Sequence, residues 1–284
     1  MKTHLDCYVC LLRQALTVAR QVGGDEATQQ AVMNSTLKCL QEVQPGLPPP
    51  YTTTQVHRII RERFPGTDPY ATLKERSTER ALALYPWLKK LVASAEDPFE
   101  TAVRLAIAGN IIDFGPADEY DLVKSVERAL AQPPAVNDIQ ALREAIQTAE
   151  WVLYLADNAG ETVFDRVLIE QIPVPVYYVV KSGPILNDAT AEDAIAAGVE
   201  QKARIIELGT DSVGTILDRC SEEFRRLYEG AEVIIAKGMG NYETLSTEGP
   251  RLFFLLQAKC EPVARDMQVP VGSLIIKRGQ AAVI

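Results

Sequence analysis

A carboxylate and an amide stand side by side where an apolar run of the chain ends. The run WVLYLA leads directly into Asp157 and Asn158, and Gly160 follows before a helix predicted from about Thr162. Carboxylate and amide oxygens are the ligands that Mg²⁺ and Mn²⁺ prefer, and a glycine lets the chain turn sharply into a helix whose N-terminus favours anions. The alternative is that Asp157 or Asn158 only caps the helix.

A second polar stretch follows the next apolar run, VPVYYVVK, and ends at Asp193. Asp188 is predicted to cap the following helix, which leaves Asp193 without a capping role. Asp193 lies about a turn and a half further along that helix, so it is placed to share a cation with Asp157. Two carboxylates about 4 Å apart repel by roughly 4 kcal/mol at an effective dielectric of 20, and a bound cation removes that cost. The alternative is a solvated acid on a helix face.

Two lysines follow two later apolar runs. Lys237 follows EVIIA and precedes Gly238 and Gly240, and Lys259 follows LFFLLQA. Glycines let backbone N–H groups approach a ligand closely and a lysine adds a point positive charge, a combination that suits a phosphate. The spacing matches neither a P-loop nor a dinucleotide fingerprint, so it names no nucleotide. The alternatives are a tight strand-to-helix turn and a lysine that only reaches solvent.

The elements that must position these residues change type at about residue 150. Before it, apolar residues three and four apart predict six to eight helices and no convincing strand, with a kink or break at Pro86. After it, short continuous apolar runs alternate with helical stretches, which indicates strands buried on both faces of a sheet. We therefore predict an α/β protein, with an all-helical domain at residues 1–150 and a Rossmann-like α/β/α layer with a mostly parallel sheet at residues 151–284.

In such a sheet ligands bind outside the carboxyl ends of the strands, so all four polar stretches are expected to meet in one crevice. Together they supply two carboxylates, an amide, two lysines and a glycine-lined turn. This is the equipment of phosphoryl transfer to water.

The net charge of the chain disfavours some classes of binding partner. The chain has 284 residues and a net charge of -9, which disfavours nucleic-acid backbones and anionic membrane surfaces. No run of about 18 apolar residues occurs and the first residues do not form a signal peptide, so we expect a cytoplasmic protein. The five cysteines are odd in number and mostly scattered, which predicts reduced thiols. No oligomeric state is indicated.

The chain also resembles, from end to end, the metal-dependent damage-control phosphatases, long known only as domain of unknown function 89. DNAGE and KGxGNxE are the specific parts of the resemblance. The stretches that carry it are Cys7-x-x-Cys10, GNIID at 109–113, DNAGE at 157–161, LNDAT followed by Asp193, KGxGNxE at 237–243, and Lys259.

The resemblance implies hydrolysis of phosphate monoesters of small metabolites, such as sugar phosphates or damaged phosphometabolites, with Mn²⁺, Co²⁺, Ni²⁺ or Mg²⁺ as cofactor. By motif position, Asp157, Asn158 and Asp193 are the expected metal ligands, and Asp157 is the best candidate for nucleophile or base. The expected substrate contacts are Asn110, Glu161, Lys237, Gly240, Asn241 and Lys259.

Two details bear on the branch of the family. Eukaryotic members usually carry Arg-Thr-x-Lys before the final lysine, whereas this chain reads Leu-Gln-Ala-Lys at residues 256–259. The pair Cys7 and Cys10 points instead to a microbial branch. The pair itself has three interpretations: a structural role over the crevice, a redox pair, or a metal site completed by other residues such as His4, Cys39 or His57.

Two rival functions stay open at this point. One is a carboxyl methyltransferase that uses S-adenosylmethionine, which a glycine-rich loop after the first strand would favour; that loop holds only Gly160. The other is a non-catalytic protein that binds a phosphometabolite or a metal. Asn110 and Asp113 end an apolar helix and are placed to line the crevice from the helical side, or else serve as a helix cap and a surface acid.

Overall fold

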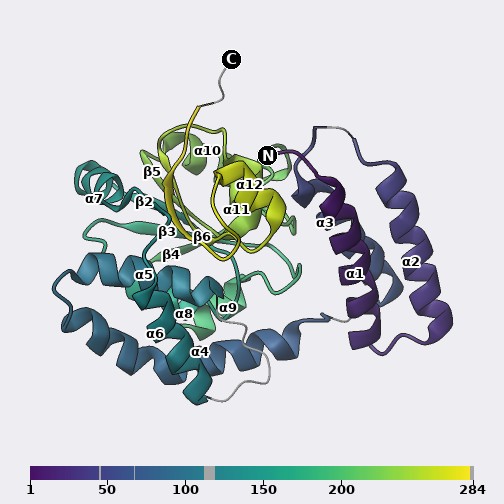
Figure 1. Ribbon diagram of the computed structural model, residues 1–284, viewed down its shortest axis with the longest axis horizontal. Helices are drawn as coiled ribbons and strands as arrows, with labels where there is room; N and C mark the ends of the chain where they lie inside the picture. The colour runs from purple at the N-terminus through teal and green to yellow at the C-terminus, as the bar shows by residue number, and fades with distance from the viewer. Residues whose placement is uncertain (45, 67, 112–118, 282–284) are drawn as a thin grey trace.

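The computed structural model describes residues 1–44, 46–66, 68–111 and 119–281, with the side chains of 111 and 119–121 left aside. Three helices at the N-terminus stand together at one side of the molecule, and the other helices pack around a central sheet (Figure 1). Asp113 lies outside the described residues.

Seven helices precede the second strand within these ranges, in agreement with the predicted six to eight. They are α1 (Leu5–Gln21), α2 (Glu26–Gln41), α3 (Pro49–Arg63), α4 (Ala71–Ala93), α5 (Pro98–Ile111), α6 (Glu119–Ala131) and α7 (Ile139–Thr148). Helices α1–α3 share a small core that includes Val18, Val32 and Ile60. Helix α4 continues past Pro86, so the break expected there is absent.

Seven strands of the described chain form one sheet in the order β1-β7-β6-β5-β2-β3-β4. They are β1 (Val136–Asn137), β2 (Val152–Leu155), β3 (Val176–Val180), β4 (Arg204–Glu207), β5 (Val233–Lys237), β6 (Leu252–Gln257) and β7 (Leu274–Arg278). Neighbours pair in parallel except β6 and β7, which are antiparallel. The predicted mostly parallel α/β fold is confirmed.

Two layers of helices cover the sheet, which explains the continuous apolar runs. Along β2, Tyr154 packs into the core beneath α4, α5 and α8 (Thr162–Ile169), whereas Leu153 and Leu155 pack into the core on the other face. The second core is covered by α10 (Glu222–Gly230), α11 (Gly238–Leu245) and α12 (Glu261–Met267). Every residue of β2 is buried, so no polar alternation is possible.

The expectation of no strand before Trp151 is wrong in one place. Val136 and Asn137 form β1 and pair with Ile275 and Ile276 of β7. Two residues are too short a run to give a strand pattern. The division of the chain at residue 150 stays a prediction.

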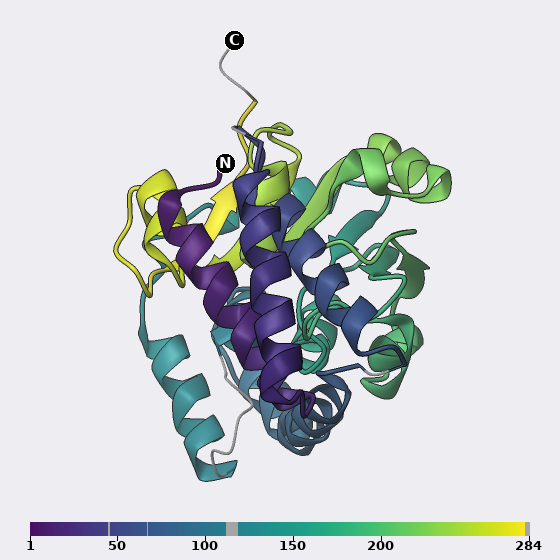
Figure 2. The same ribbon diagram turned by 90° about the vertical axis from the view of Figure 1, so that its right-hand side faces the viewer.

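The N-terminal helices cover the carboxyl edge of the sheet. Helix α3 packs on α11 and α1 packs on α12, and Figure 2 shows α1–α3 in front of the strands. Strand β2 is central: the chain passes from β2 to β3 and β4 on one side and then crosses back to β5 on the other side of β2. Ligands of such sheets bind at this reversal of direction. None of the described helices is long and apolar enough to cross a membrane.

Candidate functional site

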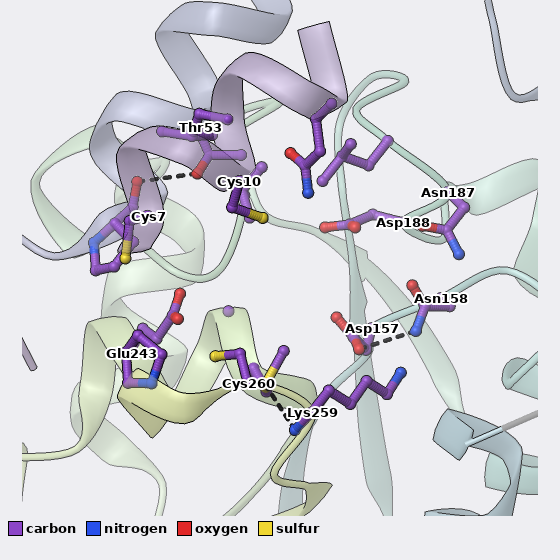
Figure 3. A pocket seen from close by; sticks show the side chains of 18 of the residues that line it. Cys7, Cys10, Thr53, Asp157, Asn158, Asn187, Asp188, Glu243, Lys259 and Cys260 are labelled. Atoms are coloured by element: carbon purple, nitrogen blue, oxygen red, sulfur yellow. Dashed lines mark hydrogen bonds between the residues drawn. The ribbon is translucent and has the colours of Figure 1, made fainter. Parts of the chain in front are cut away.

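A cleft of about 390 Å³ lies at the carboxyl edge of the sheet. One wall comes from α1, α3, α11 and Cys260, and the other from the loops after β2 and β3 together with Lys259 (Figure 3). Asp157, Asn158 and Lys259, three of the residues selected from the sequence, line this cleft together with Asn110 and Gly240.

Backbone hydrogen bonds hold the loops after β2 and β3 against each other. The N–H of Ala189 donates to the carbonyl of Asp157 at 2.8 Å, and the N–H of Ala159 donates to the carbonyl of Asn187 at 2.9 Å. This pairing brings Asp188 onto the cleft beside Asp157 and Asn158. Figure 3 shows the three side chains on the same wall.

The Asp157 carboxylate is held from three directions. Its Oδ2 accepts from Asn110 Nδ2 at 2.7 Å and from Asn158 Nδ2 at 2.9 Å. Gly238, at φ +74, lies so close that a Cβ there would collide with the carboxylate. The first glycine of KGxGNxE is therefore required by the close approach of Asp157 as well as by its backbone conformation.

The acids at this edge resist ionisation. Burial raises the pKa of Asp157 to about 8, and the neighbouring carboxylates of Glu161 and Asp188 add to the effect, against Lys259 and Lys181. Burial likewise raises the pKa of Asp188 to about 6, against Lys181, whose Nζ lies 3.6 Å from Asp188 Oδ2. Two carboxylates that repel in this way are stabilised by a cation between them.

A second charged cluster lies beneath the cleft floor. Lys237 is fully buried and its Nζ donates to Glu161 Oε1 at 2.5 Å, to Asp165 Oδ1 at 2.5 Å and to the Ala106 carbonyl at 3.0 Å. Glu161 Oε2 in turn accepts from Asn110 at 2.9 Å and from Asn158 at 3.0 Å. Glu161 and Lys237 do not line the cleft, so the structure gives these expected substrate contacts a supporting position instead.

Asp165 completes this lower cluster. It accepts from Tyr154 at 2.7 Å and from Tyr178 at 2.8 Å, and all three side chains are buried. Burial lowers the pKa of Lys237, but Asp165 and Glu161 raise it by more, so the ammonium stays charged. Asn241 is also below the surface, where its Nδ2 donates to the carbonyls of Ala156 and Lys237.

Lys259 differs from Lys237 in its burial and in its partners. It is exposed, its side chain runs along the cleft towards Asp157 and Asn158 (Figure 3), and no described residue forms an ion pair with it. An unpaired ammonium on a cleft of acids is available to an anionic ligand.

The chain is similar to known proteins over nearly its whole length. The model of the damage-control phosphatase ARMT1-like domain matches residues 3–275. The chain belongs to this family. A damage-control phosphatase of Pyrococcus horikoshii is 37% identical over 287 residues, covering 99% of both chains. One of Archaeoglobus fulgidus is 37% identical over 287 residues, covering 98% of this chain and 99% of its own.

A solved structure shares the fold. The crystal structure of a domain-of-unknown-function 89 protein from Pyrococcus horikoshii superposes with a TM-score of 0.93 at 36% identity, over 99% of this chain and all of that one (100%). Membership of the damage-control phosphatase family thus agrees with both sequence and structure. The assignment to a branch marked by Cys7 and Cys10 stays a prediction.

Asp193, the third metal ligand expected from the family resemblance, does not line the cleft with Asp157. Its Oδ2 accepts from the N–H and hydroxyl of Thr190, each at 2.8 Å, and lies 2.6 Å from Lys74 Nζ. Thr190 is the N-cap of α9 (Ala191–Ala196) and Asp193 completes the capping box. The expectation that Asp188 caps this helix and leaves Asp193 free is therefore wrong.

Asp188 is the residue that sequence reasoning missed, although a signal was present. Thr190 and Asp193 are three positions apart, which resembles the capping-box pattern at the start of a helix. Had that pattern been assigned to the helix start, Asp188 would have been left for the cleft. In the structure Asp188, and not Asp193, lines the cleft beside Asp157.

Cys7 and Cys10 line the opposite wall of the cleft, together with Cys260 and Glu243 (Figure 3). The thiols are free, and burial raises the pKa of all three. In the part of the chain that the structure describes, no group of three or more His, Cys, Asp or Glu side chains could hold a metal ion. A structural role for Cys7 and Cys10 in packing α1 over the cleft fits these contacts.

Proposed function

We propose that this family member is a metal-dependent phosphatase that hydrolyses phosphate monoesters of small metabolites. The observation that carries the proposal is one cleft that joins hard oxygen donors to an unpaired ammonium, Lys259. A cleft of about 390 Å³ suits a metabolite rather than a macromolecule.

The residues at the strand ends fit a divalent cation. Asp157, Asn158 and Asp188 would hold it, because carboxylate and amide oxygens are the donors of hard cations. Burial, with a smaller contribution from neighbouring carboxylates, raises the pKa values of Asp157 and Asp188, and such a cation would favour their ionised forms. Asn110 Oδ1 is buried without a partner among the described residues, which leaves a further oxygen nearby. When bound, the cation supplies charge neutralisation to a phosphoryl oxygen.

The protein's own residues divide the remaining work. Lys259 attracts and neutralises the phosphoryl group. Asp157 is the proposed catalytic carboxylate, either as the nucleophile towards phosphorus or as the base that takes a proton from attacking water. Asn110 and Asn158 donate to Asp157 Oδ2 and so fix the direction in which the carboxylate points. Glu161 and Lys237 hold those amides in place from below.

The methyltransferase alternative is not favoured by the loop after β2. That loop carries Asp157, Asn158 and Glu161, and a cleft lined by acids suits a cation better than an adenosyl cofactor. A non-catalytic sensor of the same phosphorylated ligand would use the same cleft without turnover, so only an assay separates it from an enzyme.

The test is hydrolysis of an aryl phosphate by protein stripped of metal with a chelator. We expect no turnover until Mn²⁺, Co²⁺, Ni²⁺ or Mg²⁺ is added. Asp157→Asn and Asp188→Asn are each expected to reduce the rate about a hundredfold or more, as expected when several kcal/mol of charge stabilisation are lost. Glu144→Gln, on the exposed face of α7, is the matched control.

Several outcomes would overturn parts of the proposal. Turnover without metal would contradict the dependence on a divalent cation. No turnover with any of the four metals would favour the non-catalytic sensor. A wild-type rate in Asp188→Asn, with loss in Asp193→Asn, would return the third ligand to Asp193. A panel of phosphorylated sugars and cofactors would then identify the substrate.

A further inference from the structure

The wall of the cleft opposite Asp157 carries hydrogen-bonding groups without partners. Glu243, on α11, points its carboxyl group into the cleft (Figure 3), and no described residue forms a hydrogen bond or ion pair with that group. Gln14, on α1, also lines this wall, and its Oε1 is buried without a partner in the described part of the chain. Both groups are therefore available to a ligand.

Charge is unevenly distributed along the cleft. Lys259 is the only basic residue among the described residues that line it, and it lies at the end of the cleft with Asp157. The opposite wall has Glu243, three thiols and, at the rim, Asp6, whose carboxylate is 3.4 Å from Arg265 on the exposed surface. One ammonium and one metal position can neutralise one phosphate, but no basic side chain among the described residues of the opposite wall can neutralise a second. The Met1 ammonium donates to the Glu243 carbonyl at 3.3 Å, but Met1 does not line the cleft.

The chemistry of the opposite wall matches hydroxyl groups. Burial raises the pKa of Glu243 to about 8, against the nearby N-terminal ammonium and with a further contribution from Asp266, so at neutral pH this carboxyl group is mostly protonated and both donates and accepts hydrogen bonds. The Gln14 oxygen accepts one more. A phosphate dianion on this wall would lose its water without gaining a cation, which is costly.

We propose that Glu243 is a specificity-determining residue, which binds the uncharged, hydroxyl-bearing end of a monophosphate ester and makes the cleft reject substrates with a second phosphate. The inference rests on the proposed phosphatase function and adds the part of the substrate that the phosphate site leaves undetermined.

The test compares a hexose monophosphate with the corresponding bisphosphate in the metal-loaded protein. Wild type is expected to prefer the monophosphate by about tenfold or more in kcat/KM, and Glu243→Lys to lose or reverse that preference because it places a cation beside the second phosphate. Glu144→Lys changes the net charge by the same amount on the exposed face of α7 and is expected to keep the wild-type ratio. Equal use of both substrates by wild type, or a wild-type ratio in Glu243→Lys, would overturn the inference.

A second pair of variants covers the case in which the lysine disturbs folding. Glu243→Gln keeps a neutral hydrogen-bonding group and is expected to leave KM for the monophosphate within about twofold, whereas Glu243→Leu is expected to raise it about tenfold, the value of a lost hydrogen bond. Inhibition by inorganic phosphate should stay unchanged in both, since phosphate does not reach Glu243. An unchanged KM in Glu243→Leu would contradict the proposal.

Failure of the inference is distinguishable from failure of the proposed function. If wild type hydrolyses neither ester with any metal, the phosphatase proposal fails, and isothermal titration calorimetry with the same two ligands still measures the preference. Tighter binding of the monophosphate by about tenfold, lost in Glu243→Lys, supports the subsite. Equal affinities refute it.

Discussion

Two clusters of the same residue types lie one above the other at the carboxyl edge of the sheet. The lower one joins Lys237 to Glu161 and Asp165, all fully buried with their charges paired. The upper one joins Lys259 to Asp157 and Asp188. Among the described contacts Lys259 and Asp157 form no ion pair, and Asp188 has only Lys181, at 3.6 Å. The difference is one of partners rather than of composition.

This difference in partners indicates which cluster supports the site and which one binds the ligand. A buried charge that has all its partners cannot turn to a ligand without breaking costly contacts. Acids that repel each other beside an unpaired lysine have partners still to gain. The upper cluster is thus the place where a ligand binds with a net gain, and the lower cluster fixes its geometry through Asn110 and Asn158.

The largest effect is expected from breaking the lower cluster. Lys237→Met should lower the free energy of unfolding by about 3–5 kcal/mol, because it leaves Glu161 and Asp165 buried and uncompensated. Thermal or denaturant unfolding measures this. Lys90→Met, on the exposed face of α4, is the control, and equal stability of the two variants would mean that the lower cluster is not structural.

A smaller effect, of another kind, is expected from the upper lysine. Lys259→Ala should raise KM about tenfold to a hundredfold, the value of a charge-assisted hydrogen bond, and leave the melting temperature unchanged because the side chain is exposed. Steady-state kinetics at saturating metal gives both KM and kcat. If KM for the phosphate ester did not change, Lys259 would not contact the phosphate.

The pH dependence of the free energy of unfolding should also distinguish the acids of the upper cluster from those of the lower one. The folded-state pKa values of Asp157, about 8, and Asp188, about 6, lie above the ordinary 3.8, so the folded protein holds protons that the unfolded chain has lost. The free energy of unfolding of metal-free protein should therefore fall as pH rises from about 4 to about 8. Added Mn²⁺ replaces those protons, so it should stabilise more at the higher pH.

Differential scanning fluorimetry tests this expectation. The rise in melting temperature on adding Mn²⁺ should be larger near pH 8 than near pH 5 by about 2–4 °C. Asp157→Asn should reduce the difference, because it removes one of the titrating groups. An equal rise at both pH values would show that these acids do not bind the ion.

The smallest effect is expected at Asp193. Asp193→Asn weakens the contact with Lys74 and the capping box, which should cost about 1 kcal/mol of stability. Since Asp193 does not line the cleft, kcat/KM should stay within about twofold of wild type, whereas Asp188→Asn loses activity. The paired assay of these two variants decides which acid belongs to the upper cluster.

The fold was largely predictable because burial on both faces leaves a strong sequence pattern. Strand β2 is buried at every position, so its residues form a continuous apolar run, and β3, β5, β6 and β7 are likewise buried at most positions. Strand β4, at the edge of the sheet, is buried only at Ile206. Strand β1 has only two residues and gives no pattern. The antiparallel direction of β7 could not be predicted from the sequence either, because a hydrophobic pattern does not indicate the direction of a strand.

The location of the site at the strand ends was predictable, but which of its residues line the cleft and which are buried beneath it was not. Asp157, Asn158 and Lys259 follow strands and line the cleft as expected. Lys237 also ends a strand, yet as the last residue of β5 it points inward, and that depends on how the neighbouring helices pack. The roles of Asp188 and Asp193 depend on which residue caps α9, a local competition that composition alone does not resolve.

The collision expected at Gly238 has a consequence for how this protein can vary. A single methyl group at residue 238 would occupy the space of the Asp157 carboxylate. Residue 238 is therefore restricted by the fold as well as by the site, because its φ of +74 disfavours any other residue and the carboxylate fills the space of a side chain. Random mutagenesis selected only for soluble expression should already keep glycine at this position.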